Sequence, residues 1–260
     1  MTTTQHDVPA ASDLPGHDEA PDSFFGRALV AATALSGVRI DRTEYLRRSL
    51  SPYCSDDQVT RAVEETPAAA GIPDHVISAI ADSSIKHETG RVTTLSALAG
   101  IPGGFALLAT VPADTAQYLG HMLRVAQKLA YLYSWPDLFE EDDEPDDATQ
   151  NVLTLFVGVM FGVQAANKGV GLVAAKFAEQ VARRLPKQAL TKGVAYPLVK
   201  AVAKQLGVQM TKSVFAKGVA KAIPVVGGLL SGGLTLASFL PMAKRLKKHL
   251  AALPSSKAAV

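Results

Sequence analysis

Apolar residues recur along this chain at the spacing of α-helices. Between Phe24 and Arg48 they stand three to five positions apart, which predicts a helix over this range. Strand-like alternation of apolar and polar residues is scarce, whereas Ala, Leu, Lys and Gln are abundant. We therefore expect a mainly α fold with glycine-rich apolar helices or helical hairpins.

The strongest helical pattern lies in DTAQYLGHMLRVAQKLAYLYSW, residues 114–135. Asp114 to Gln117 supply a start signal for this helix. One face carries an apolar stripe made of Tyr118, Met122, Val125, Leu129 and Leu132. Another face carries a polar row made of Gln117, His121, Arg124 and Lys128. We expect this row to be solvated; contact with a ligand or a lipid headgroup is the alternative.

Two short polar motifs indicate further helix starts. Ser55-Asp56-Asp57-Gln58 has the form of a capping box, and Cys54 before it is interpreted as a free thiol without a role. Asp147 with Gln150 forms a second start signal, and Asp147 is also the last residue of the segment DLFEEDDEPDD at 137–147. That segment has eight acids in eleven residues, which predicts a loop. It lacks the alternating ligands and central glycine of a calcium loop.

Three uncharged stretches, 92–113, 148–167 and 222–243, are about long enough to cross a bilayer. Each has a G-x-x-x-G pair, and we expect helix packing at Gly100, Gly104, Gly158, Gly162, Gly228 and Gly232. Lysines flank the last stretch on both sides, so neither orientation of a span satisfies the positive-inside rule. With Pro224 and Pro241 as well, we expect 222–243 to form a buried glycine-rich hairpin or broken helix. Reversible insertion into one leaflet and a true span are the alternatives.

Charge divides the chain into two unlike parts. Residues 1–150 hold 23 acids and 10 bases, a net charge of −13, whereas residues 151–260 hold one acid, Glu179, and 16 bases, a net of +15. This asymmetry predicts a basic face for an anionic partner, an internal clamp between the halves, or both. We predict membrane or anion contact by Lys192, Lys200, Lys204, Lys212, Lys217, Lys221, Lys244, Arg245, Lys247 and Lys248.

Several familiar kinds of site are disfavoured by the residues present. Lysine makes up 13 of the 16 bases after residue 150 and aromatic residues do not alternate with them, which makes nucleic acid a poor partner. Gly169, Gly171 and Ala174 match a dinucleotide fingerprint, but no strand pattern precedes them and no acid follows Glu179. The six histidines and the single cysteine lack zinc-site spacing. We expect no cofactor, no metal and no catalytic residues.

From about Val92 to Leu250 the chain resembles the EcsC family of bacterial proteins. The resemblance lies in IPGGFALLATVPADTAQYLGHMLRVAQKLAYLYSWPDL, in LTLFVGVMFGVQAANKGVG and in AIPVVGGLLSGGLT. Family members often have glycine where this chain has Ser134. The resemblance implies a mainly helical domain and supplies no catalytic residues. The family name comes from an operon that also encodes an ABC transporter, which hints at work near a membrane.

These observations give an expected organisation and function. We expect a disordered acidic tail at 1–22, an N-terminal helical segment at 23–90, an EcsC-like helical domain at 91–250 and a short tail at 251–260. The expected function is that of a non-enzymatic accessory protein, cytoplasmic and peripheral at the inner face of the cell membrane, which binds anionic lipid. A membrane transporter or another protein is a further expected partner.

Two other functional classes stay open at this stage. One is a soluble helical protein that binds a lipid or another hydrophobic ligand in its core. The other is an enzyme of unknown reaction, which a cleft joining His121 and Arg124 to an N-terminal carboxylate would indicate.

Overall fold

The computed structural model describes residues 21–99, 111–139, 145–179, 187–221 and 227–256. Within these ranges the chain forms α-helices and no strand, which confirms the mainly α fold. The helices are, in chain order, α1 (Pro21–Thr33), α2 (Arg42–Leu50), α3 (Asp56–Glu64), α4 (Asp74–Ala99), α5 (Val111–Leu132), α6 (Asp147–Phe161), α7 (Gln164–Glu179), α8 (Lys187–Thr191), α9 (Tyr196–Lys221) and α10 (Gly227–Ala251). A short 3-10 turn, η3 (Pro254–Ser256), follows α10.

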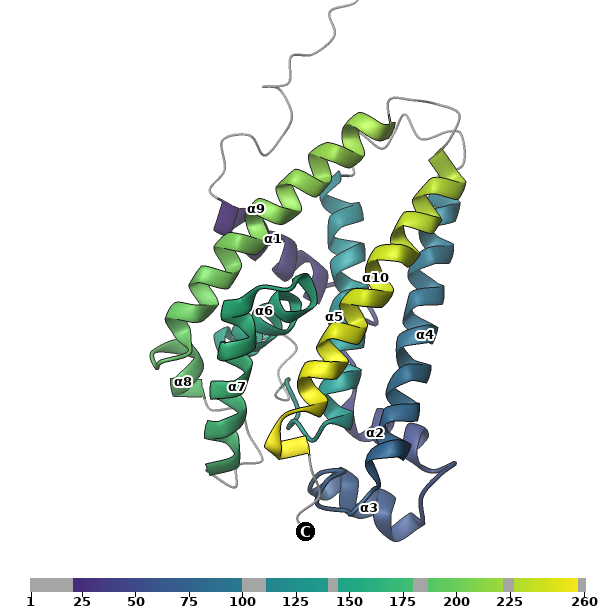
Figure 1. The fold of residues 1–260 in the computed structure, drawn as a ribbon, viewed down its shortest axis with the longest axis vertical. Helices are drawn as coiled ribbons and strands as arrows, with labels where there is room; N and C mark the ends of the chain where they lie inside the picture. The colour runs from purple at the N-terminus through teal and green to yellow at the C-terminus, as the bar shows by residue number, and fades with distance from the viewer. Residues whose placement is uncertain (1–20, 100–110, 140–144, 180–186, 222–226, 257–260) are drawn as a thin grey trace, which may run out of the picture.

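Long helices packed side by side make up most of the molecule (Figure 1). α10 packs against α4, α5 and α6, while α1 packs against α9 and α5. α6 lies at the centre, in contact with α7, α9 and α10, and every residue from Val152 to Met160 is buried. A helix that is apolar on all sides belongs in a protein core or a membrane. The uncharged stretch from 148 therefore supplies the central core helix.

The helix expected from Phe24 to Arg48 is interrupted, and this prediction is wrong for residues 34–41. α1 ends at Thr33, and Asp41 begins α2 by accepting a hydrogen bond from the Glu44 amide at 2.7 Å. An aspartate cap satisfies a backbone donor that has no partner within the helix. The local cap therefore overrides a periodic apolar pattern that continues across the break.

Other helix starts are partly as predicted. The capping box of Ser55 and Gln58 is confirmed. The next acidic cap is Asp146 rather than Asp147: its side chain accepts from the Thr149 amide at 2.8 Å, which places Asp147 in the first turn. α5 begins at Val111, three residues before the predicted start at Asp114.

The predicted packing glycines have different roles. A Cβ atom at Gly158 would lie 2.5 Å from Val202 of α9 and 2.7 Å from Ala166 of α7, so only glycine permits this contact. Gly162 instead ends α6 in the left-handed conformation, with φ of 80°, and divides the stretch 148–167 into two helices. Gly228 and Gly232 lie within α10, and Gly100 and Gly104 fall outside the described residues.

Within the described residues, the stretch 222–243 forms one continuous helix from Gly227 onward, so the predicted hairpin or broken helix is wrong for residues 227–243. Pro241 lies inside α10, where it removes one backbone hydrogen bond. Both Pro241 and Ala237, whose carbonyl loses this partner, are exposed, so water can hydrate the carbonyl. Residues 222–226, including Pro224, fall outside the described residues.

The boundaries expected between segments do not coincide with breaks in the fold. Residue 90 lies inside α4, and one hydrophobic cluster contains residues from both sides of it, including Leu46, Leu123 and Phe156. α10 and η3 extend to Ser256, into the expected C-terminal tail. The expected N-terminal tail lies almost entirely outside the described residues, with α1 starting at Pro21.

Candidate functional site

Glu88, in α4, is the centre of a buried charge cluster. Its carboxylate accepts hydrogen bonds from Lys128 Nζ at 2.6 Å and from Arg124 Nε at 3.2 Å, and His121 Nδ1 lies 3.5 Å from it. These three partners belong to α5 and stand three and four residues apart, so they share the helix face that packs on α4. Glu88 itself has no exposed surface.

The prediction that the polar row of α5 faces solvent is wrong for most of its members. His121 is 9% exposed and Lys128 is 5% exposed, Arg124 is half-buried, and Gln117 alone is exposed. Burial of Lys128 and partial burial of Arg124 are possible because the Glu88 carboxylate meets them inside the protein. The apolar stripe of the same helix is confirmed, with Met122, Val125, Leu129 and Leu132 buried.

The cluster joins His121 and Arg124 to an N-terminal carboxylate, yet its chemistry is that of a structural anchor. Burial by itself would raise the pKa of Glu88, but hydrogen bonds from His121 and Lys128 and the charges of Lys128 and Arg124 lower it to about 2. A carboxylate with so low a pKa is a weak proton acceptor at neutral pH. Without exposed surface, it also cannot touch a substrate in this conformation. The cluster therefore fastens α4 to α5.

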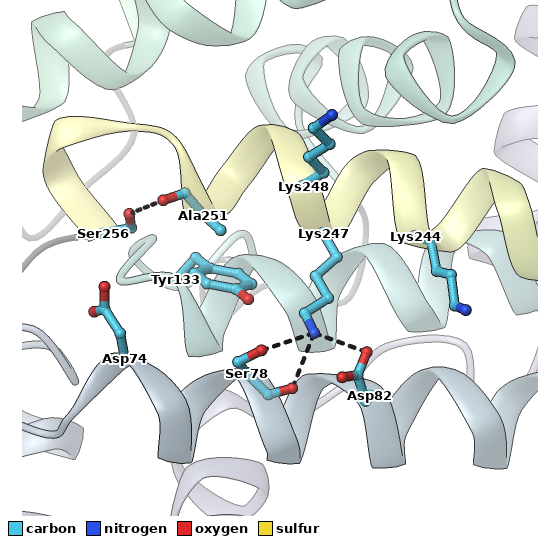
Figure 2. A pocket seen from close by; sticks show the side chains of 9 residues that line it. All are labelled: Asp74, Ser78, Asp82, Tyr133, Lys244, Lys247, Lys248, Ala251 and Ser256. Carbon is cyan, nitrogen blue, oxygen red and sulfur yellow. Dashed lines mark hydrogen bonds and ion pairs between the residues drawn. The ribbon is translucent and has the colours of Figure 1, made fainter.

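A hollow of about 430 Å³ lies elsewhere, between α4 and α10 (Figure 2). Eight of its nine lining residues carry a polar or charged group, and its volume lies in the range of small-molecule sites. Asp74, Ser78 and Asp82 line it from α4. The remaining lining residues are Tyr133, Lys244, Lys247, Lys248, Ala251 and Ser256.

Lys247 spans this groove and connects its two walls. Its Nζ lies 2.7 Å from Asp82 Oδ1 and donates to the Ser78 carbonyl at 3.1 Å and to Ser78 Oγ at 2.9 Å. These three acceptors use all three N–H donors of the ammonium group. Lys247, predicted as an anion contact, is thus already paired within the protein.

Lys244 and Lys248 differ from Lys247 although they lie on the same helix. Both are exposed, and neither has an ion-pair partner among the described residues. They stand four residues apart, which places them on one face of α10. Of the three predicted lysines in the groove, these two are available to an external anion.

Arg245 has a structural partner as well. Its guanidinium donates to the Met160 carbonyl and lies against Gly162, where α6 ends. A cation at the C-terminal end of a helix satisfies a carbonyl and opposes the helix dipole. Arg245 therefore ties α10 to the end of α6.

The remaining predicted lysines belong to α9 and to the turn before it. Lys192, Lys200 and Lys204 are exposed. The other three are Lys212, Lys217 and Lys221, in the second half of α9. The structure describes the backbone of this half but not the exposure of its side chains.

The turn between α8 and α9 has a feature that the sequence did not reveal. Val194 is 76% exposed, the largest exposed fraction of any large apolar side chain in the described part of the chain. Exposed Lys192 precedes it and exposed Lys200 follows, with Lys200 Nζ 5.1 Å from the centroid of the Tyr196 ring. An apolar side chain and two lysines close to it in the sequence are thus exposed to solvent.

The structure offers no support for a metal or cofactor site in the ranges that it describes. No group of three or more His, Cys, Asp or Glu side chains there is placed to hold a metal ion. Gly169 lies inside α7, where an added Cβ would be 2.6 Å from Leu155, so it serves helix packing rather than a phosphate-binding turn. Burial raises the pKa of the Cys54 thiol, which opposes activation as a nucleophile.

Comparisons with known proteins do not identify the chain. No family model matches it, and neither a curated protein nor a solved structure matches it significantly. Among the described helices, none combines the length and the apolar character needed to cross a bilayer.

Proposed function

We propose that this protein is a non-enzymatic accessory protein that binds the surface of an anionic membrane. The observation that carries the proposal is the α8–α9 turn, where exposed Val194 stands between exposed Lys192 and Lys200. Apolar side chains that enter the interface together with cations that meet the headgroups are typical of peripheral membrane proteins. Tyr196 adds an aromatic side chain, a residue type favoured at that depth.

Charge supports the same surface. Residues 151–260 carry a net charge of +15, and near an anionic bilayer each lysine contributes about 1 kcal/mol of binding free energy at moderate salt. Lys204, Lys244 and Lys248 add exposed cations beyond the turn. The inner leaflet of a cell membrane has the negative surface potential that this distribution fits, so we place the protein there.

Membership of the EcsC family is part of this proposal. Ser134, at the position where family members often have glycine, adopts φ of 69°, a left-handed conformation that glycine reaches most easily. Its Oγ accepts a hydrogen bond from the Ala68 amide at 3.1 Å, which helps to hold the serine there. The left-handed backbone at this position is therefore the conformation that a glycine of the family would adopt most easily.

Flotation of the purified protein with vesicles tests the proposal. We expect binding to vesicles that contain phosphatidylglycerol, little binding to phosphatidylcholine alone, and release by high salt because ions screen surface charge. Equal binding to both vesicle types, or to neither, would refute an anionic-lipid function. Lipid retained by the protein without vesicles would favour the hydrophobic-ligand alternative instead.

A matched pair of substitutions tests the role of the turn. Val194→Asp removes an apolar contact and adds a negative charge, so we expect about tenfold weaker flotation on anionic vesicles. Val30→Asp makes the same change at a valine of α1 that is 51% exposed, and we expect it to leave flotation unchanged. Equal losses in both variants would show that net charge, not the turn, controls binding.

A further inference from the structure

The groove between α4 and α10 contains a hydroxyl group without a protein partner. Tyr133 is 5% exposed and lines the groove, yet its hydroxyl makes no hydrogen bond with any of the described residues. Burial, together with Asp82 and Asp74, raises the pKa of Tyr133 to about 12, so the hydroxyl keeps its proton at neutral pH. The hydroxyl is open to the hollow, where water or a ligand can supply a hydrogen-bond partner.

Cations surround the same hollow. Lys244 and Lys248 line it from α10 and are exposed, and their long side chains can turn toward a bound group. Lys247 is held in place by Ser78 and Asp82, so the centre of the groove is rigid. The groove thus combines one paired cation, two cations without an ion-pair partner among the described residues, and a hydroxyl donor. Figure 2 shows that the side chains of Lys244 and Lys248 extend in opposite directions from α10.

The charges also restrict the ligand. Asp82 is paired with Lys247, and the charges of Asp82 and Asp74 both act on the Tyr133 hydroxyl. An anion at this hydroxyl therefore needs the opposing charges of Lys244 and Lys248 on α10. A phosphate monoester fits them because it has about two negative charges and three terminal oxygens that accept hydrogen bonds. The volume of about 430 Å³ leaves room beside a phosphate for a small substituent.

We infer that this groove is a binding site for a phosphate monoester group, with Tyr133 as hydrogen-bond donor and Lys244 and Lys248 as the cations that grip it. The group can belong to a soluble phosphate ester or to the headgroup of a lipid such as phosphatidic acid. The site lies on α4 and α10, apart from the α8–α9 turn in the chain, and it does not require the proposed membrane function.

Two binding experiments distinguish the sources. Calorimetric titration of the full chain with glycerol 3-phosphate at low salt measures binding of a soluble monoester. Flotation compares vesicles of phosphatidic acid with phosphatidylglycerol vesicles of equal surface charge. Binding of the soluble ester assigns the site to free phosphate esters. A preference for phosphatidic acid without binding of the soluble ester assigns it to the lipid headgroup. Either outcome supports the site, and the absence of both overturns it.

Matched variants localise the binding in whichever arm shows it. Tyr133→Phe removes only the hydroxyl, and we expect about tenfold weaker binding, the effect of losing one hydrogen bond to a charged group. Tyr53→Phe, at a tyrosine that is 65% exposed, should change nothing. The double variant Lys244→Ala/Lys248→Ala should weaken phosphate binding at least about tenfold.

The double variant Lys86→Ala/Lys168→Ala removes two exposed lysines outside the groove and outside the α8–α9 turn, and it should keep binding of the soluble ester, or the preference for phosphatidic acid. Equal losses in the two lysine pairs would overturn the site, because general electrostatics would then explain the binding. If the protein binds phosphate but does not float on phosphatidylglycerol vesicles, the membrane proposal is refuted and the phosphate site is still supported.

Discussion

The α4–α5 interface and the α8–α9 turn both concentrate basic side chains, but they use them in opposite ways. At the interface, Lys128 is 5% exposed and meets the fully buried Glu88 at 2.6 Å. At the turn and in the first part of α9, Lys192 and Lys200 are exposed, and Val194 between them in the sequence is 76% exposed. A lysine inside the protein needs a carboxylate within reach, whereas a lysine at the surface stays available to an outside anion.

α10 shows the same contrast within two consecutive residues. Lys247 is paired with Asp82 across the groove, and Lys248 is exposed. The total charge of a segment therefore does not say how many cations it offers to a partner. Which helix face carries each lysine, and what packs against that face, decides the number.

The interface should respond most strongly when its carboxylate is removed. Glu88→Gln keeps the size of the side chain but leaves buried Lys128 and half-buried Arg124 without their anion. We expect the free energy of unfolding to fall by about 3–5 kcal/mol, as measured by chemical denaturation. Glu64→Gln, at an exposed position of α3, should change it by less than about 0.5 kcal/mol. Similar small effects in both variants would show that the cluster contributes nothing to stability.

Lowering the pH should weaken the same interaction, because Glu88 then becomes protonated. The pKa of Glu88 is about 2 in the folded protein, against an ordinary value of 4.5. A lowered folded-state pKa stabilises the protein above pH 4.5, and this stabilisation, about 3 kcal/mol, is lost as the pH falls from 4.5 toward 2.

Denaturation midpoints measured from pH 6 to pH 2 should therefore fall more steeply in the wild type than in Glu88→Gln. Parallel slopes over this range would contradict the assignment of a low pKa to Glu88.

The surface should respond to a smaller electrostatic change. Asp146, at the end of the acidic loop, pairs with Lys187 at 2.8 Å, which ties the loop to the start of α8, shortly before the α8–α9 turn. Deleting residues 140–144 removes five acids that precede Asp146 in the sequence. We expect several-fold stronger flotation on anionic vesicles at low salt, with the gain lost at high salt. Unchanged flotation would show that the loop does not screen the basic surface.

Local signals in the sequence predict much of the fold. The capping box at Ser55 and the apolar stripe of α5 follow from neighbouring residues, and both are found in the structure. The break between Thr33 and Asp41 was missed because the apolar spacing continues through these residues. The cap at Asp41, which begins α2, was not recognised. The continuity of α10 through Pro241 was missed because packing against α4, α5 and α6 compensates for one lost hydrogen bond.

The candidate site depended on contacts that no local pattern contains. Glu88 lies 40 residues before Lys128, so their pairing exists only because α4 packs against α5. No pattern in the sequence singled out Tyr133, because its place in the groove depends on α10, more than 100 residues later. Val194 gave no signal because its exposure is set by the turn in which it lies.

The sequence by itself determined the helical class, several helix boundaries and the concentration of positive charge after residue 150, because spacing, capping and composition act over a few residues or over whole segments. Only the tertiary structure decided which of those cations are internal and which are available. A lysine changes from structural anchor to surface contact according to the carboxylate that packing brings near it, and that distance is set by helices far apart in the chain.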